Sequence, residues 1–430
     1  MLEPTVTKTP DLSVSMMADN LTGSEIIKLA AEINEKIKNG ERIFNYTIGD
    51  FDPNIFPIPV ELNNAIISAY NSHQTNYPAA NGIVELRKAV STFLKEKEQL
   101  DYSPEEILIA GGARPLIYGT YVTLLNAGDT VVFPVPSWNN NHYCHLTQSQ
   151  MILVETKAEN NFMPTADEIR PHLKNATLLS LCSPLNPTGT IFKKEQLENI
   201  CDLVLEENKR RGKGGRPLYL MYDQIYWVLT FGDNKHYNPV SLRPEMKEYT
   251  IFIDGISKSL SATGVRVGWG FGPKKIMDKM RAIISHIGAW APKAEQVAVA
   301  NYLQMKPEME KFVTDFKRRI DQRLVKFYDG FVQLKKEGYK VDAIAPQAAI
   351  YLTVQLNLAG MKTRDGKILN TQKDVTQYIL DEAKLALVPF TAFGSTDKSS
   401  WYRLSVGTCN SSEIDEVFAS LRRVLSGLSN

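Results

Sequence analysis

The stretch DGISKSLSATGVRVGWG, residues 254–270, places one amine and one guanidinium among hydroxyls and glycines. Lys258 closely follows an apolar run, and Arg266 comes eight positions later, beyond a glycine-marked turn. A lysine amine forms a Schiff base with an aldehyde, and an arginine holds a phosphate through paired hydrogen bonds. The stretch would therefore suit a phosphorylated ligand that carries an aldehyde.

Polar residues follow two other apolar runs of the chain. Asn186 lies in SPLNPTG, after the run 176–182, and Asp223 ends the run PLYLMY, with Tyr226 three positions later. The carboxyl ends of neighbouring strands form the ligand site of an open α/β sheet. If the ligand has a ring nitrogen, Asp223 would keep that nitrogen protonated. Tyr226 and Asn186 would then bond the ring hydroxyl.

A further run, EILIAGG, ends in a Gly111-Gly112 turn that opens a helix. The positive end of a helix attracts a phosphate, so this turn is a predicted anion site. The groups predicted to hold the phosphate are the backbone N–H groups of Ala113 and Arg114, the Ser257 hydroxyl and the Arg266 guanidinium. Trp138, in PVPSWNN, is placed to stack on the ring. We expect the side chain of Arg114 to be mainly solvated.

The elements that position these residues are short strands between helices. Continuous apolar, β-rich runs recur from residue 107 onward, as strands covered on both faces require. The predicted strands are EILIAGG, DTVVFPV, MILVET, ATLLSLCSP, PLYLMYDQIYW, YTIFIDGISK and VRVGWGFG. The predicted fold class is α/β, with a mostly parallel central sheet, helices on both faces, and a smaller α+β domain.

Helical periodicity marks both ends of the chain. Residues 23–40 predict an amphipathic helix that Ser24 caps and Gly40 ends. Its predicted buried stripe consists of Ile26, Leu29, Ala30, Ile33 and Ile37. The predicted buried stripe of the last helix consists of Ile414, Val417, Phe418, Leu421, Val424 and Leu425.

Composition narrows the classes of partner. The 49 Lys and Arg residues nearly balance 48 Asp and Glu residues, so neither nucleic acid nor an anionic membrane is an expected partner. The four cysteines are dispersed without a CxxC pair, and no apolar run reaches membrane-spanning length. We therefore expect a cytoplasmic protein. The stretch HYCH, residues 142–145, lacks a second cluster of ligands, so no metal is expected.

Six fragments occur along the chain in a fixed order: YPAANGIVELR, PSW, SPLNPTG, YDQIY, SKSLSATGVRVG and YRLSVG. Together they resemble the fold-type I pyridoxal-phosphate aminotransferases of class I/II, from about residue 20 to the C-terminus. The resemblance implies pyridoxal 5′-phosphate as the cofactor. It also implies ping-pong transfer of an amino group from an L-amino acid to a 2-oxo acid.

The resemblance assigns roles and domains as well. It implies Lys258 as the Schiff-base lysine, Asp223 as the ring-nitrogen partner, Tyr226 and Asn186 as partners of the phenolic oxygen, and Ser257 and Arg266 as phosphate ligands. Arg403 is implied to hold the substrate carboxylate, with Gly49, Trp138 and Asn186 lining the same pocket. Tyr77 is implied to reach the cofactor phosphate of a neighbouring subunit, in a homodimer with shared active sites. Residues 1–61 are expected to form an N-terminal arm and the first part of the small domain, 62–305 the large domain, and 306–430 the rest of the small domain.

The resemblance leaves the amino donor open. Members with SPLNPTG and PSW act mostly on aspartate or aromatic amino acids, and we expect an aspartate/2-oxoglutarate enzyme. The alternatives are an aminotransferase for aromatic or other apolar amino acids and a C–S lyase on the same fold. A dicarboxylate donor needs a second cation facing Arg403. Lys293 is the candidate, although Trp290 nearby equally favours an apolar side chain. Phe390 replaces a glycine of many members, so we expect a reshaped pocket lid or a different turn.

Overall fold

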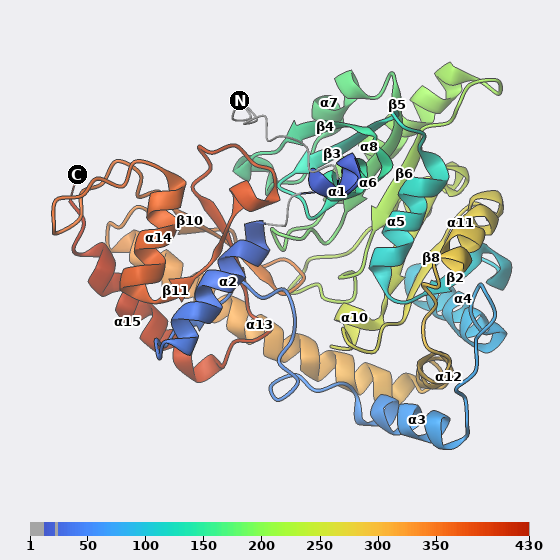
Figure 1. Ribbon diagram of the computed structural model, residues 1–430, viewed down its shortest axis with the longest axis horizontal. Coiled ribbons are helices and arrows are strands. Elements are labelled where there is room, and N and C mark those ends of the chain that lie inside the picture. The colour runs from blue at the N-terminus through green and yellow to red at the C-terminus, as the bar shows by residue number, and fades with distance from the viewer. Residues whose placement is uncertain (1–12, 22–24, 430) are drawn as a thin grey trace.

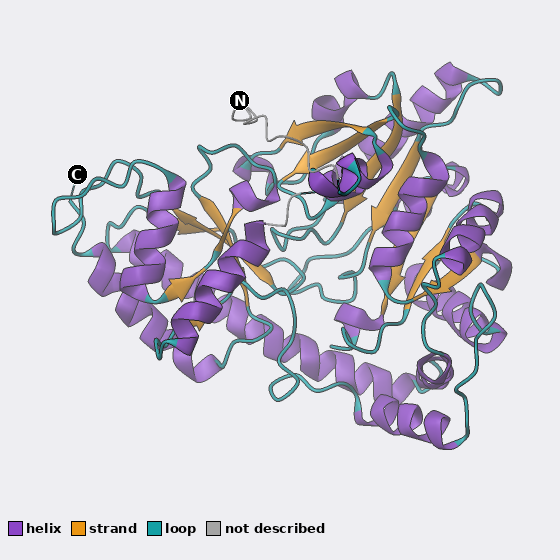
Figure 2. Ribbon diagram, in the orientation of Figure 1, coloured by secondary structure: helices purple, strands orange, loops and turns teal. Residues whose placement is uncertain are grey.

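A computed structural model describes residues 13–21 and 25–429 of the chain (Figure 1). Two lobes stand side by side, each with a sheet covered by helices (Figure 2). The predicted cap Ser24 and the side chain of Ile26 lie outside the described residues. Within the described part of the chain, no helix is both long enough and apolar enough to cross a membrane.

The larger lobe contains a seven-stranded sheet with the order β2-β8-β7-β6-β5-β3-β4. Its strands are β2 (Ile107–Ala110), β3 (Thr130–Val135), β4 (Gln150–Glu155), β5 (Ala176–Cys182), β6 (Tyr219–Asp223), β7 (Thr250–Gly255) and β8 (Gly268–Phe271). The strands from β7 to β4 pair in parallel, and only β8 runs antiparallel to its two neighbours. The predicted mostly parallel sheet is confirmed.

Helices cover both faces of this sheet, which explains its continuous apolar strands. One face packs on α4 (Val84–Glu98), α8 (Lys194–Arg211) and α12 (Lys293–Tyr302). The other face packs on α5 (Ala113–Leu124), α6 (Asn140–Thr147) and α11 (Lys274–His286). The remaining helices of this lobe are α3 (Val60–Asn71), α7 (Ala166–Ile169), α9 (Pro239–Leu242) and α10 (Ile256–Ser259), and α1 (Met16–Asp19) precedes both lobes.

The smaller lobe joins both ends of the chain. Strand β1 (Phe44–Asn45) pairs in parallel with β11 (Leu385–Ala386). An antiparallel sheet has the order β12 (Val388–Pro389), β13 (Trp401–Ser405), β10 (Tyr351–Leu356), β9 (Val341–Ala343). Its helices are α2 (Glu25–Lys38), α13 (Lys306–Lys336), α14 (Gln372–Ala383) and α15 (Ile414–Leu425). In Figure 1, α2 lies beside α14 although the two are far apart in sequence.

Helix α13 links the two lobes. Met309, near its start, belongs to the core of the large lobe, whereas the side chains from Phe316 to Leu334 belong to the core of the small lobe. The small-lobe core also includes Ile225 and Tyr226, which follow β6 of the large sheet. The end of a central strand and the small lobe therefore share one apolar core.

The two amphipathic stripes differ in how completely they are buried. All six stripe residues of α15 are buried, as predicted. In α2, Ile33 is buried against Leu380 and Ala386, but Ile37 is 46% exposed. The prediction for Ile37 is wrong, because the apolar surface beneath α2 ends about one turn earlier and the neighbouring Lys36 pairs with Asp381 instead.

Gly189 of SPLNPTG lies where the loop after β5 packs closely against the small lobe. This close packing predicts the effect of a substitution on stability. Its φ is +70°, and a Cβ atom there would lie 2.1 Å from the backbone oxygen of Tyr351. Gly189→Ala should therefore cost at least about 2 kcal/mol of the free energy of unfolding. Gly214→Ala is the control, since a Cβ there meets nothing within 4 Å. Equal thermal unfolding temperatures for the two variants would contradict the close contact.

Candidate active site

A pocket of about 690 Å³ opens where strands β5, β6 and β7 end, between the two lobes. It brings together the predicted residues from seven separate parts of the chain. The predicted residues that line it are Gly49, Ala113, Arg114, Trp138, Asn186, Asp223, Tyr226, Ser257, Lys258, Arg266 and Arg403. Among the residues predicted to bind the cofactor or the α-carboxylate, Tyr77 alone does not line it.

Lys258 lies in α10, the short helix that follows β7. Its Nζ donates a hydrogen bond of 2.6 Å to the backbone oxygen of Gly49. The pKa of Lys258 is lowered to about 8, mainly by burial. The charge of Asp50 opposes this shift, and the charges of Arg403, Arg114 and Arg266 contribute to it. A substantial fraction of this amine is neutral near physiological pH, as a nucleophile or a base requires.

Asp223 is the last residue of β6 and reaches the pocket floor. The backbone N–H of Ile225 donates to its Oδ1 at 3.1 Å. Burial raises the pKa of Asp223 to about 6, which the hydrogen bond from Ile225 partly offsets. A protonated ring nitrogen placed beside it would be strongly favoured, because the ion pair would sit in a low dielectric.

The glycine turn before α5 packs directly on Arg266. The guanidinium donates to the backbone oxygens of Gly111 at 2.8 Å and Thr263 at 2.7 Å. A Cβ at Gly112 would lie 2.3 Å from this guanidinium. Helix α5 starts at Ala113 and has no side-chain cap, so its first backbone N–H groups face the pocket without intrahelical acceptors. Together with the buried Ser257, the turn forms a compact set of donors for a phosphate.

Arg403, on β13, is only 2% exposed. It donates to Asn186 Oδ1 at 2.9 Å and to the backbone oxygen of Thr47 at 2.7 Å. Its Nε is buried without a hydrogen-bond partner among the described residues. No carboxylate within residues 13–21 and 25–429 pairs with this guanidinium, so it is suited to hold the carboxylate of a ligand.

Tyr351, from β10, completes the pocket wall and was not predicted from the sequence. Its hydroxyl lies 2.7 Å from that of Tyr226, and its ring centroid lies 4.7 Å from the guanidinium carbon of Arg403. A Cβ at Gly49 would meet the Tyr351 hydroxyl at 2.8 Å, which explains why glycine occupies that position. Tyr351 lies in an ordinary apolar strand, so its spacing in the sequence carries no signal of a role in the site. Asp50 was also missed, although it directly follows Gly49.

Arg114 is exposed, as expected, but its side chain is not simply solvated. Its guanidinium carbon lies 4.6 Å from the ring centroid of Trp138, and both residues line the pocket. The expected exposure is confirmed, and the contact with Trp138 is a feature that the sequence did not reveal. The ring of Trp138 orients the cation at the edge of the site, because an aromatic face attracts a guanidinium.

Two predicted residues lie outside this pocket. Tyr77 is 82% exposed, and its ring centroid lies 5.2 Å from that of Trp290. Lys293 donates to Asn76 Oδ1 at 2.7 Å and does not face Arg403 within this chain. Arg114 takes the place of Lys293 as the candidate second cation, because its exposed side chain lines the pocket.

Phe390 is fully buried and does not line the pocket. Its ring packs edge-on against Phe162, with 5.1 Å between centroids, and against Phe393 at 6.4 Å. Phe393 in turn lies 4.9 Å from the guanidinium carbon of Arg403. The aromatic residue at 390 therefore belongs to a small apolar cluster that supports the Arg403 side of the site.

The set of donors in the pocket fits pyridoxal 5′-phosphate. Phosphate donors gather at the α5 turn, an amine of lowered pKa lies at Lys258, and a buried carboxyl lies at Asp223. Arg403 lies on the small-lobe side of the pocket and is available to bind a substrate carboxylate. The residues present thus match both ends of the cofactor and the substrate beside it.

The charges around Lys258 generate a prediction for cofactor-free protein. Asp50→Asn removes a charge that raises the pKa of Lys258, so the midpoint for arylation of this amine should move to lower pH. Arg114→Met removes a charge that lowers this pKa, so the midpoint should move to higher pH. Mass spectrometry of labelled Lys258 over a pH series measures both. Shifts in the same direction would refute the electrostatic account.

Comparison with known proteins adds independent findings. Residues 45–421 match the family Aminotransferase class I and II. A protein of Rickettsia felis named probable aspartate/prephenate aminotransferase is 29% identical over 420 residues, with 97% of each chain covered. An aspartate aminotransferase of Geobacillus stearothermophilus is 30% identical over 396 residues, covering 90% of this chain and 93% of its own.

Solved structures share the fold. A crystal structure of the aspartate aminotransferase from Rhizobium meliloti has a TM-score of 0.86 and 24% identity, covering 97% of this chain and 99% of its own. The aspartate aminotransferase of Thermus thermophilus with maleate has a TM-score of 0.84 and 24% identity, covering 96% and 99%. These similarities extend over both lobes.

Proposed function

Because this chain belongs to the class I and II aminotransferases, whose cofactor is pyridoxal 5′-phosphate, we propose that it transfers the amino group of aspartate to a 2-oxo acid such as 2-oxoglutarate. The observation that carries the choice of donor is the pair of guanidiniums, Arg403 and Arg114, in the pocket of Lys258. The names of the relatives from Rickettsia felis and Geobacillus stearothermophilus support the same donor.

Three groups of residues hold the cofactor. The N–H groups of Ala113 and Arg114, Ser257 and Arg266 bind the phosphate, and Asp223 accepts a hydrogen bond from the ring nitrogen. Tyr226 and Asn186 bond the phenolic oxygen, and Trp138 packs on the ring. When bound, pyridoxal phosphate supplies an aldehyde and an electron-withdrawing ring that makes the α-hydrogen of an amino acid acidic.

The protein's own residues then orient the donor and move its proton. Arg403 holds the α-carboxylate of the donor, which places the α-carbon near Lys258. The neutral amine of Lys258 takes the proton from the α-carbon of the donor and then delivers it to the cofactor carbon. The pKa of about 8 suits both directions of this transfer, because the amine gains and loses a proton near working pH.

Arg114 holds the second carboxylate of the donor. Its guanidinium is exposed to the pocket over Trp138, and no ion pair to a carboxylate is found for it in the described ranges. The charge is therefore available to a ligand. An apolar donor would gain nothing from it, so Arg114 favours aspartate and glutamate over alanine and tyrosine.

The donor is tested by the absorption of the bound cofactor when single amino acids are added without a 2-oxo acid. We expect aspartate and glutamate to convert the yellow cofactor band to the band of the aminated cofactor, and tyrosine and alanine to act far more slowly. Release of pyruvate and ammonia would instead identify a lyase. Lys258→Ala is the control and should show no turnover while it keeps the fold. Preferred conversion by tyrosine would overturn the choice of donor.

Arg114→Met separates the second cation from the rest of the site. Loss of one charge-assisted contact should lower kcat/KM for aspartate by about tenfold to a hundredfold, and leave kcat/KM for alanine nearly unchanged. Steady-state kinetics with both donors measures this. An equal loss for both donors would show that Arg114 serves the cofactor and not the side chain of the substrate.

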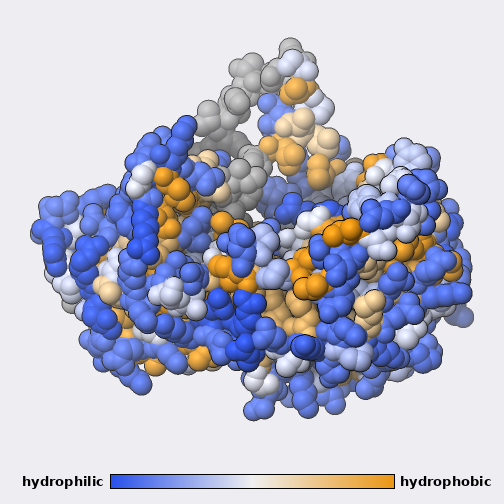
Figure 3. All heavy atoms as spheres, turned by 90° about the horizontal axis from the view of Figure 1, so that it is seen from below, coloured by the Kyte–Doolittle hydropathy of each residue, from blue (hydrophilic) through white to orange (hydrophobic). Residues whose placement is uncertain are grey.

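The proposed enzyme is a homodimer with shared active sites. Tyr77 is too exposed to act within its own chain, and Val60, Ile67 and Tyr70 expose apolar surface on α3 nearby. Figure 3 shows the molecule from below, the side where α3 lies in Figure 1, with apolar patches among polar ones. A second copy seated there would bury this surface and bring Tyr77 to the neighbouring phosphate.

Tyr77→Phe tests the shared site. Loss of one hydrogen bond to a charged phosphate should weaken retention of the cofactor by about tenfold, without changing the dimer seen by light scattering. Dialysis followed by absorbance measures retention, with Tyr339→Phe as the control for loss of a hydroxyl elsewhere. Unchanged retention in Tyr77→Phe would remove this residue from the site.

A cytoplasmic location is part of the same proposal. All four cysteines are free thiols, and three of them are buried. Such a set fits a reducing compartment, where disulfides do not form.

A further inference from the structure

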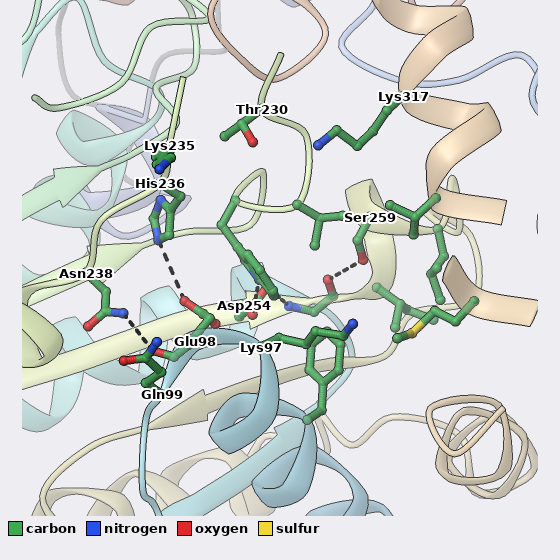
Figure 4. Close-up of a pocket in the computed structure, with 18 of the residues that line it drawn as sticks. Lys97, Glu98, Gln99, Thr230, Lys235, His236, Asn238, Asp254, Ser259 and Lys317 are labelled. Carbon is green, nitrogen blue, oxygen red and sulfur yellow. Dashed lines mark hydrogen bonds and ion pairs between the residues drawn. The ribbon is translucent and has the colours of Figure 1, made fainter. Parts of the chain in front are cut away.

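A second cavity of about 690 Å³ is lined by Ser259 of α10 but not by Lys258 (Figure 4). We call it the α13 pocket; its walls come from the end of α4, the segment 227–242, α10 and the first turns of α13. It shares no lining residue with the active-site pocket. No part of the chemistry derived above uses it.

One wall of the α13 pocket is aromatic. Phe93 packs on Trp227 with 5.7 Å between ring centroids and on Trp269 with 6.4 Å. Trp227 is fixed in place because its Nε1 donates to Asp254 Oδ2 at 2.9 Å. Leu260, Met309 and Val313 add aliphatic surface to the same space. This wall suits the flat apolar body of a small ligand.

The mouth of the α13 pocket is basic. Lys97 and Lys235 are exposed there, and Lys317 is half-buried on α13. Figure 4 shows the amine of Lys317 and the hydroxyl of Thr230 directed toward the space between them. No ion pair of these three lysines with a carboxylate is found within residues 13–21 and 25–429. These three donors outnumber the one exposed carboxylate that lines the pocket, that of Glu310, so the charges favour an anionic group.

The inner polar groups do not oppose an anion. Glu98 accepts two hydrogen bonds from Gln224 Nε2, at 2.7 and 2.9 Å, and burial raises the pKa of Glu98 as well as that of Asp254. Both ring nitrogens of His236 are buried without a hydrogen-bond partner, and Nε2 lies 3.7 Å from Glu98. A buried polar ring without a partner needs an explanation, and a ligand in the cavity is one that the lining position of His236 allows.

We propose that the α13 pocket binds a monocarboxylate with an aromatic ring, its ring against Trp227 and Phe93 and its carboxylate at Lys317. An aromatic 2-oxo acid and an aromatic amino acid share this chemistry. Residues that line the α13 pocket are adjacent in sequence to residues that line the active site, so a ligand in the α13 pocket can affect the reaction. Tyr226 faces the active site and Trp227 the α13 pocket, just as Lys258 and Ser259 face the two pockets from α10.

The test is calorimetric titration of the holoenzyme with 3-phenylpropionate, which has neither an amino nor an oxo group and cannot react at Lys258. Lys317→Met should weaken binding by about tenfold or more, since a charge-assisted contact is lost. Lys311→Met is the matched control, because Lys311 is exposed on the same helix but does not line the pocket. Thr314→Trp, which fills the mouth without changing charge, should also abolish binding.

Two arms separate the sources of the ligand. Phenylpyruvate is titrated into the aldehyde form of the enzyme and L-phenylalanine into the aminated form, because neither pair can react. Binding that is noncompetitive with aspartate, weakened about tenfold or more in Lys317→Met and lost in Thr314→Trp supports the site. The proposal is overturned by absence of binding to the unaltered enzyme, by unchanged affinity in either variant, or by simple competition with aspartate. A probe that binds only in the active site competes with aspartate and keeps its affinity in both variants, which distinguishes an aromatic donor site from the α13 pocket.

Discussion

The buried guanidinium of Arg403 is the contact on which the arrangement of the site depends. It extends from β13 of the small lobe, bonds Asn186 in the loop after β5 of the large lobe, and bonds Thr47 in the N-terminal segment. A cation this deeply buried is tolerable only when its donors are matched. Three distant segments are therefore held together by one charge, whose Nε has no hydrogen-bond partner among the described residues.

The same concentration of positive charge sets the reactivity of Lys258. Arginines 114, 266 and 403 all lower the pKa of this amine, and burial adds the largest effect. Gly49 and Asp50 act in the opposite direction, since one accepts a hydrogen bond from the amine and the other provides a negative charge. A site built to bind a phosphate and carboxylates thus also produces a lysine that is partly neutral near physiological pH.

Two segments that carry reactive residues form the thin wall between the active-site pocket and the α13 pocket. Residues 225–228 and 256–259 each turn some side chains toward the active site and others toward the α13 pocket. A ligand on one side of such a wall meets the same backbone as a ligand on the other. The buried pair Glu98 and Asp254 stiffens this wall through Gln224 and Trp227. The geometry therefore provides a short physical connection between the two cavities.

The sequence by itself determined the central sheet and the identity of most of the residues in the site. Continuous apolar runs specify strands buried on both faces, and polar residues at their carboxyl ends meet at one edge of a parallel sheet, so Asn186, Asp223 and Lys258 could be located from the sequence alone. Only the tertiary structure decided the rest. Tyr351 belongs to an unremarkable strand, the guanidinium of Arg114 is placed by Trp138, and the exposure of Ile37 depends on where the neighbouring lobe surface ends. Contacts between segments hundreds of residues apart depend on packing between lobes, and local periodicity carries no record of that packing.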